Sequence, residues 1–145
     1  MEISGKASVK AQPEAVGRVL SDPAMLQRSL PGCRLLEPEA DGYRIEISIG
    51  VAAVRGIYQG AIRILRHEPG RLFDFEIALE APRGFVEATV HTEFTASDEG
   101  TGIAYSAESE LGGPLAALGQ RVAAGVATLL VRQFCEGIGR EAQAL

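Results

Sequence analysis

Apolar and polar residues alternate along most of the chain before residue 112, a pattern typical of β-strands that bury one face. One alternation covers residues 1–10, and six more follow between residues 33 and 111. Short sequences that favour turns separate the later ones, such as Asp41-Gly42 and Glu68-Pro69-Gly70. Strands joined by short turns pair antiparallel. The pattern therefore predicts an antiparallel sheet of seven strands.

Two short helices are predicted between the first strand and the other six. Pro13 opens the first helix, because proline is tolerated in the first helical turn, and Ser21-Asp22-Pro23 ends it. Asp22 also caps the second helix, which runs from Ala24 to about Ser29. The sequence Leu30-Pro31-Gly32-Cys33 then breaks the helix and leads into the sheet.

A long C-terminal helix is predicted from about Gly113 to Gln143, with a length of about 45 Å. Apolar residues recur along it at spacings of three and four, which places them on one face. These residues are Leu115, Leu118, Val122, Val126, Leu129, Leu130, Phe134 and Ile138. Gly119 falls within the same face. An apolar face of this length requires a wide apolar partner, which only the sheet can supply.

The predicted fold class is therefore α+β. A curved seven-stranded antiparallel sheet surrounds the long C-terminal helix, and the two short helices after the first strand close one end. The chain shows no internal repeat, no low-complexity segment and no linker. We expect residues 1–145 to form one domain, since this length suffices for a substantial core.

Charge and cysteine content narrow the function classes. A net charge of −5 argues against a nucleic-acid partner, because proteins that bind a phosphate backbone usually present a basic face. Cys33 and Cys135 have neither zinc-site spacing nor a disulfide framework, so we expect no metal. The chain opens without the basic start and apolar run of a signal peptide, and Arg121, Arg132 and Glu136 interrupt the C-terminal helix. We therefore expect a soluble, cytoplasmic protein.

Several short sequences along the chain match a known family. They are Met1-Glu2-Ile3-Ser4-Gly5, Asp22-Pro23, Leu30-Pro31-Gly32-Cys33, Val54-Arg55-Gly56-Ile57-Tyr58-Gln59-Gly60, Gly100-Thr101 with Tyr105, Gly112-Gly113, Leu115-Ala116-Ala117-Leu118-Gly119 and Gln133-Phe134. In these residues and in the order of its elements, the chain resembles the CoxG family, named for the CoxG subunit of carbon monoxide dehydrogenase. That family belongs to the SRPBCC superfamily of START- and Bet v 1-like proteins. The resemblance implies the helix-grip fold, in which a curved sheet surrounds the C-terminal helix.

The resemblance also implies a non-catalytic accessory protein of a molybdenum hydroxylase of the carbon monoxide dehydrogenase type. Its implied partners are the hydroxylase subunits and an apolar small molecule, because the superfamily binds such molecules between sheet and helix. A quinone or another lipophile is the implied ligand, and no further cofactor is expected. Two alternatives stay open. One is a docking or maturation factor with an empty cavity, and the other is a superfamily enzyme, a cyclase or hydrolase, that acts on an apolar small molecule.

The chain departs from the family pattern at two places. Gly17 stands where members of the family often carry a tryptophan, which predicts a more open pocket entrance. Many members also continue beyond the helix into a tail that could reach a membrane, whereas this sequence ends at Leu145. We therefore expect no more than a transient membrane contact, with the protein in the cytoplasm or peripheral to the inner face of the cell membrane.

A curved sheet and a straight helix do not match in shape, so side chains or a ligand must fill the space between them. Candidate lining residues lie on the apolar faces of the predicted elements. They are Leu26, Leu30, Ile49, Tyr58, Ile62, Phe73, Phe75, Ile77, Val90, Tyr105, Leu118, Gly119, Val122 and Val126. A buried Tyr58 or Tyr105 would need a hydrogen-bond partner. At Gly60 and Gly119, two interpretations stay open: the missing side chain leaves room for a ligand, or it allows close backbone contact.

The two histidines are the other candidates for chemistry. His67 lies beside a turn and is expected to be exposed. His91 shares the polar face of its strand with Glu87 and Glu93, where carboxylates could hold it protonated. That face is expected to meet solvent, out of reach of a bound substrate. The chain also lacks a Ser-His-Asp, Cys-His or phosphate-loop pattern, so no catalytic residue is assigned.

Overall fold

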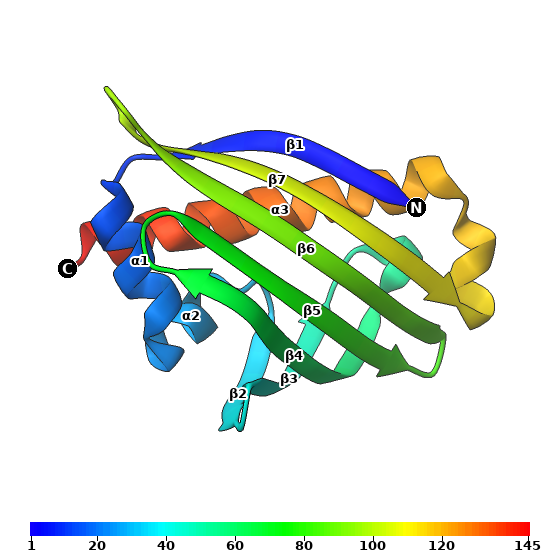
Figure 1. The fold of residues 1–145 in the computed structure, drawn as a ribbon. Helices are drawn as coiled ribbons and strands as arrows, with labels where there is room; N and C mark the ends of the chain where they lie inside the picture. The colour runs from blue at the N-terminus through cyan, green and yellow to red at the C-terminus, as the bar shows by residue number, and fades with distance from the viewer.

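The computed structural model describes all residues from 1 to 145, and Figure 1 shows a curved sheet with helices on one side. The strands are β1 (Glu2–Val9), β2 (Cys33–Glu39), β3 (Gly42–Ile49), β4 (Gly56–Glu68), β5 (Leu72–Ala81), β6 (Gly84–Ser97) and β7 (Gly100–Gly112). They form one antiparallel seven-stranded sheet in the order β1-β7-β6-β5-β4-β3-β2. The predicted fold class, a helix-grip arrangement, is confirmed.

The helices are α1 (Pro13–Ser21), α2 (Pro23–Ser29) and α3 (Gln120–Gln143), with two short 3₁₀ helices, η1 (Ala52–Val54) and η2 (Gly113–Leu118). Proline stands at the start of both α1 and α2. The Asp22 carboxylate accepts hydrogen bonds from the backbone N–H groups of Ala24, at 2.9 Å, and Met25, at 3.1 Å. This is the predicted cap, and it satisfies donors that the first turn leaves unpaired.

The C-terminal helix is shorter than predicted. It begins at Gln120 and not near Gly113, so its length is about 36 Å. Leu115 in η2 donates its backbone N–H to the Arg83 carbonyl at 3.1 Å, which holds η2 against the β5–β6 turn. The chain must then turn to enter α3, and it does so at Gly119, where φ is +81°. The prediction that Gly119 lies in the helix interior, facing the sheet, is therefore wrong.

The tightest packing lies at one end of the molecule, where α1, α2 and the last turns of α3 meet the sheet (Figure 1). Val16 and Val19 on α1 are completely buried, and Ile138 on α3 is 2% exposed. Gly137 lets α3 approach the end of α2, because a Cβ there would overlap the Ser29 carbonyl. We call this region the closed end.

Gly17 belongs to the closed end and does not widen an entrance. Its position is buried, and a Cβ there would lie 2.6 Å from the Gly70 nitrogen in the β4–β5 turn. The missing side chain therefore allows α1 to pack directly against that turn. The prediction of a more open pocket entrance at Gly17 is wrong, because the neighbouring backbone occupies the space.

Candidate functional site

The inner face of the sheet, which is the face toward α3, lies opposite a loosely packed first half of that helix. No residue from Gln120 to Phe134 is fully buried, and Val122 is 43% exposed. The main neighbours of α3 are α1, α2 and β1, so the middle strands do not come close to its axis. Ile77 and Val90 on the inner face are likewise only half-buried. Apolar groups therefore face each other here without close packing.

Small residues contribute to this arrangement. Pairing across β6, β7 and β1 places Ala88 next to Ser109, Val90 next to Ala107, and Tyr105 next to Gly5. Alanine, serine and glycine side chains reach only a short way toward the helix. At Gly125, on the first half of α3, an added Cβ would meet no atom within 4 Å. Both sides of the interface thus leave space that larger side chains would fill.

The composition of α3 differs from its burial. By length and hydropathy the helix could cross a membrane, although only 22% of its apolar window is buried in the fold. The core helix of a soluble protein meets the same criterion when it is mostly buried. Arg121, Arg132 and Glu136 thus do not exclude a membrane-spanning length, contrary to expectation. An apolar helix surface of this kind is available to a ligand or to another surface.

The fourteen predicted lining residues divide into two groups. Leu26, Tyr58, Ile62 and Phe73 are buried in the core, and Leu30, Ile49, Phe75, Ile77, Leu118 and Val126 are half-buried against it. Val90 and Tyr105 are half-buried on the inner face outside that cluster, whereas Gly119 and Val122 are exposed. The structure brings the strand candidates onto one face. Their role as a ligand site stays a prediction.

Tyr58 and Gly60 have structural partners. The Tyr58 hydroxyl donates to the Val54 carbonyl at 2.7 Å, so η1 supplies the partner that a buried tyrosine needs, and burial raises the pKa of this phenol. At Gly60, a Cβ would overlap the backbone of β5 at Ala78. Of the two interpretations of Gly60, close backbone contact is therefore the one observed.

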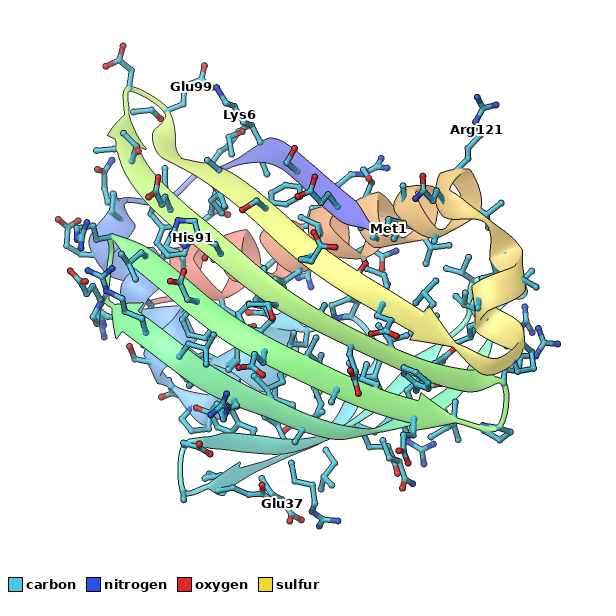
Figure 2. All side chains as sticks on the ribbon, turned by 45° about the vertical axis from the view of Figure 1, so that its right-hand side comes forward. Met1, Lys6, Glu37, His91, Glu99 and Arg121 are labelled. Atoms are coloured by element: carbon cyan, nitrogen blue, oxygen red, sulfur yellow. The ribbon has the colours of Figure 1, made fainter.

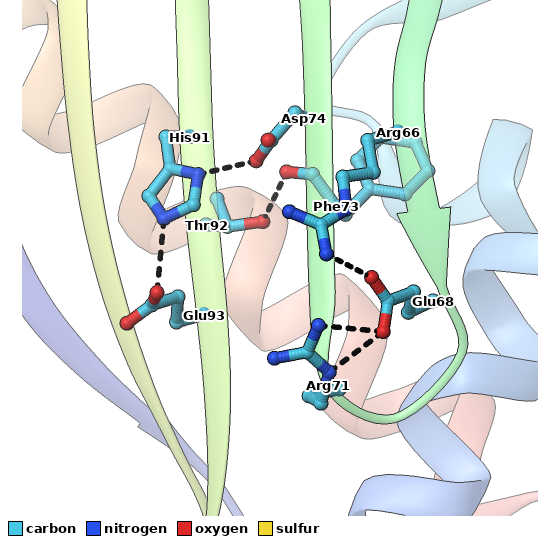
Figure 3. A network of polar contacts seen from close by, with 8 residues as sticks. All are labelled: Arg66, Glu68, Arg71, Phe73, Asp74, His91, Thr92 and Glu93. Atoms are coloured by element: carbon cyan, nitrogen blue, oxygen red, sulfur yellow. Dashed lines mark hydrogen bonds and ion pairs between the residues drawn. The ribbon is translucent and has the colours of Figure 1, made fainter.

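The histidines lie in different surroundings, and neither matches its prediction in full. His67 is half-buried and not exposed: its ring packs edge-on against Phe73, with centroids 4.8 Å apart, and its buried Nε2 has no hydrogen-bond partner. Burial lowers the pKa of His67 below 6.5. His91 lies on the outer face of the sheet, as predicted, but its partners are Glu93 and Asp74 and not Glu87 (Figure 3).

The His91 ring bridges two strands. Its Nδ1 lies 2.5 Å from the Asp74 carboxylate on β5, and its Nε2 lies 3.2 Å from Glu93 on β6. The hydrogen bond to Glu93, followed by that to Asp74, raises the pKa of His91 above 6.5. Figure 2 shows His91 on the side of the sheet that faces away from α3. Its position favours an outer-surface ion pair over contact with a molecule at the inner face.

The outer face also carries two open grooves that sequence reasoning did not find, with volumes of about 560 and 480 Å³. They share Ala61, Ala78 and Glu87. The acidic lining residues of the larger groove are Glu76, Glu87, Glu108 and Glu110. Glu87 lies directly opposite Glu110 across β6 and β7, an arrangement in which like charges repel.

The sequence of residues 5–143 matches the family model for CoxG, the CoxG subunit of carbon monoxide dehydrogenase. The chain belongs to the CoxG family. The resemblance seen in its short motifs is thus confirmed, and the match extends from β1 to the end of α3. No protein with curated annotation is significantly similar to this CoxG-family chain.

Solved structures place the fold in a wider group. A conserved protein from Geobacillus kaustophilus is 34% identical, with a TM-score of 0.93 over 99% of this chain and 96% of that one. A protein from Chromobacterium violaceum is 18% identical, with a TM-score of 0.73 over 96% of this chain and 94% of its own. A Thermus thermophilus protein is also 18% identical, with a TM-score of 0.71, covering 99% and 98%. The last two show the fold alone.

Proposed function

We propose that this protein is a non-catalytic accessory protein of a carbon monoxide dehydrogenase-type molybdenum hydroxylase, and that it carries a lipophilic, quinone-like molecule. Membership of the CoxG family supports the link to carbon monoxide dehydrogenase. The ligand would lie between the inner face of the sheet and the first half of α3. One observation carries this proposal: apolar residues face each other there, yet none from Gln120 to Phe134 is fully buried.

The physical argument concerns exposed apolar area. Removing apolar surface from water contributes about 25 cal/mol per Å². A lipophile between the helix and the sheet would cover residues such as Val126 on one side and Val90 on the other, both half-buried without it. The few polar side chains nearby suit a ligand with a large apolar part, because ligand sites are mostly apolar with a few polar groups.

The experiment is an extraction. The protein is purified from its own host without detergent, extracted with organic solvent, and the extract is analysed by mass spectrometry beside that of an unrelated protein purified in the same way. The proposal predicts a quinone or another lipophile in near-stoichiometric amount. An extract that matches the control would contradict the carrier function.

A second function, recruitment of a dehydrogenase subunit, is favoured by the acidic groove on the outer face. Glu87 and Glu110 lie opposite each other in this groove, and neither forms an ion pair, whereas Arg63 pairs with Glu76. A basic segment of a partner would relieve their repulsion. Changing both residues to glutamine should weaken capture of the dehydrogenase subunits while leaving the fold intact. Unchanged capture would remove the groove from the docking surface.

We further propose that the protein is cytoplasmic and touches the inner face of the cell membrane transiently. From Gln120 to Cys135 the only charged residues are Arg121 and Arg132, and Figure 2 shows Arg121 projecting from the start of α3. Basic and exposed apolar groups together favour anionic lipid surfaces. Sedimentation with phosphatidylglycerol vesicles should exceed that with phosphatidylcholine vesicles, and equal, background sedimentation with both would contradict this contact.

A further inference from the structure

Most hydroxyl groups on the inner face are already occupied by the protein itself. The Tyr58 hydroxyl donates to Val54, the Thr92 hydroxyl donates to the Phe73 carbonyl at 2.6 Å, and the Ser109 hydroxyl donates to the Met1 carbonyl at 3.2 Å. A donor engaged in this way is not available to a ligand without the loss of a protein hydrogen bond.

The Tyr105 hydroxyl differs from these groups. Tyr105 lies on the inner face between Thr92 on β6 and Gly5 on β1, and its hydroxyl makes no hydrogen bond within the protein. The hydroxyl is also not sealed from solvent, since His67 Nε2 is the only completely buried polar side-chain atom that lacks a partner. It is therefore an accessible donor and acceptor on a largely apolar surface.

Gly5 fixes the direction of this side chain. A Cβ at Gly5 would lie 2.5 Å from the Tyr105 hydroxyl oxygen and 2.8 Å from the ring carbon that bears it. The phenol ring thus extends across β1 into space that is free only because residue 5 has no side chain. The ring does not project straight toward the helix, and its hydroxyl borders the space between sheet and helix.

The position of this row along α3 can be derived from the contacts at its closed end. Val9 on β1 lies beside Gly139 on α3, because a Cβ at Gly139 would be 3.5 Å from a Val9 methyl group. Gly5 lies about 13 Å back along β1, which corresponds to about nine residues of helix. Figure 1 shows β1 and α3 running in a similar direction, so the Tyr105 row lies opposite the middle of α3, at about Leu130. This part of α3 is only half-buried.

We propose that the Tyr105 hydroxyl is the polar anchor of the ligand site and selects lipophiles that carry a hydrogen-bonding oxygen, such as a quinone carbonyl, over plain hydrocarbons of the same shape. This inference rests on the proposed carrier function. The apolar surroundings hold the body of the ligand, and the unpartnered hydroxyl discriminates its head group, because a buried carbonyl without a donor loses its hydrogen bonds to water.

Tyr43 provides a matched control. It also lies on the inner face, and its hydroxyl has no hydrogen bond. However, Tyr43 is buried and lies close enough to Asp22, at the α1–α2 junction, for that carboxylate to help raise its pKa, after the larger effect of burial. Changing Tyr43 to phenylalanine therefore removes the same chemical group at the closed end, away from the proposed anchor.

The experiment titrates the purified protein with 2-methyl-1,4-naphthoquinone and with 2-methylnaphthalene by calorimetry. Tyr105→Phe should weaken binding of the quinone about tenfold and leave the hydrocarbon unchanged. Tyr43→Phe should leave both affinities as in the parent. Gly5→Ala keeps the hydroxyl but displaces it, and should also weaken quinone binding selectively.

The possible outcomes separate the two proposals. If the parent binds the quinone and both Tyr105→Phe and Gly5→Ala bind it equally well, the anchor is overturned and the carrier function stands. If Tyr105→Phe weakens both probes alike, the residue contributes shape and not head-group selection, which also overturns the anchor. If the parent binds neither probe, the carrier function fails, and the anchor fails with it.

Discussion

His67 illustrates how a single residue couples the stability of this fold to pH. Its half-buried ring packs against Phe73, and its buried Nε2 has no partner. Burial disfavours the charged form, so the pKa of His67 in the folded state lies below its ordinary value of 6.5. Between the folded and the ordinary pKa values, the unfolded chain binds more protons than the folded one. Stability must therefore fall as the pH decreases through this window.

We predict that His67→Phe removes this fall. The free energy of unfolding from urea titrations should decrease for the parent between pH 7.5 and pH 5.5, the probe range chosen here to stay above the carboxylate pKa values of about 4. The variant should lose less, because Phe73 keeps an aromatic neighbour and no buried group titrates. His91 acts in the opposite direction, since a raised pKa stabilises the protonated fold at low pH, and both proteins contain it. Parallel pH curves for the two proteins would refute the assignment to His67.

The residue scale also shows what the sequence could have revealed. The Pro82-Arg83 turn joins β5 and β6 with Ala81 opposite Gly84, so counting outward places Asp74 opposite His91. The same counting from the β6–β7 turn places Glu87 opposite Glu110. Alternation alone gave the face of each residue correctly and missed these partners, because it does not define register. The unpaired Nε2 of His67 could not be foreseen, since it depends on how the β4–β5 region packs.

At the scale of elements, α3 has two halves that differ in packing. Gly137 in the second half approaches the Ser29 backbone, whereas Gly125 in the first half faces open space. We predict that Gly137→Ala destabilises the protein by about 1–3 kcal/mol through overpacking. Gly125→Ala should stabilise it by about 0.5–1 kcal/mol through helix propensity. Urea unfolding of both variants checks this, and similar effects of the two substitutions would contradict a helix with one tight and one open half.

Gly119 separates η2 from α3 and gives a third element-scale test. Its φ of +81° and ψ of 159° belong to a region that only glycine adopts readily. Gly119→Leu should therefore destabilise the protein by about 1–3 kcal/mol, although no atom lies near the added Cβ. Gly125→Leu, in regular helix, is the control. A Gly119→Leu variant as stable as its parent in thermal unfolding would show that the chain can continue as helix through this position.

Sequence patterns predicted the seven strands and both short helices because alternation and capping residues are local signals. They predicted too long a terminal helix, because the apolar spacing continues through Leu115 and Leu118. The contact that separates η2 from α3, between Leu115 and Arg83, joins residues distant in sequence. The extent of burial along α3 was likewise not predictable, since it depends on how far the sheet curves away from the helix.

At the scale of the whole molecule, the fold is tight at one end and open at the other. Its accessible surface is 7941 Å², compared with about 7,100 Å² expected for a monomer of 15.3 kDa, and 26 of 145 residues are buried. The closed end supplies completely buried residues such as Val16 and Val19, while the first half of α3 supplies none. This asymmetry suits a protein that is stabilised at one end and binds a ligand at the other.

The most direct test fills the proposed space. Val126 on α3 is half-buried against the core, whereas Thr128 is exposed. Both are changed to tryptophan, and each variant is titrated with 2-methyl-1,4-naphthoquinone by calorimetry beside the parent, with thermal unfolding to show that all three are folded. A ligand between the sheet and α3 predicts that Val126→Trp loses at least tenfold in affinity, while Thr128→Trp binds like the parent. A folded Val126→Trp variant that binds as tightly as the parent would contradict a ligand site in this space.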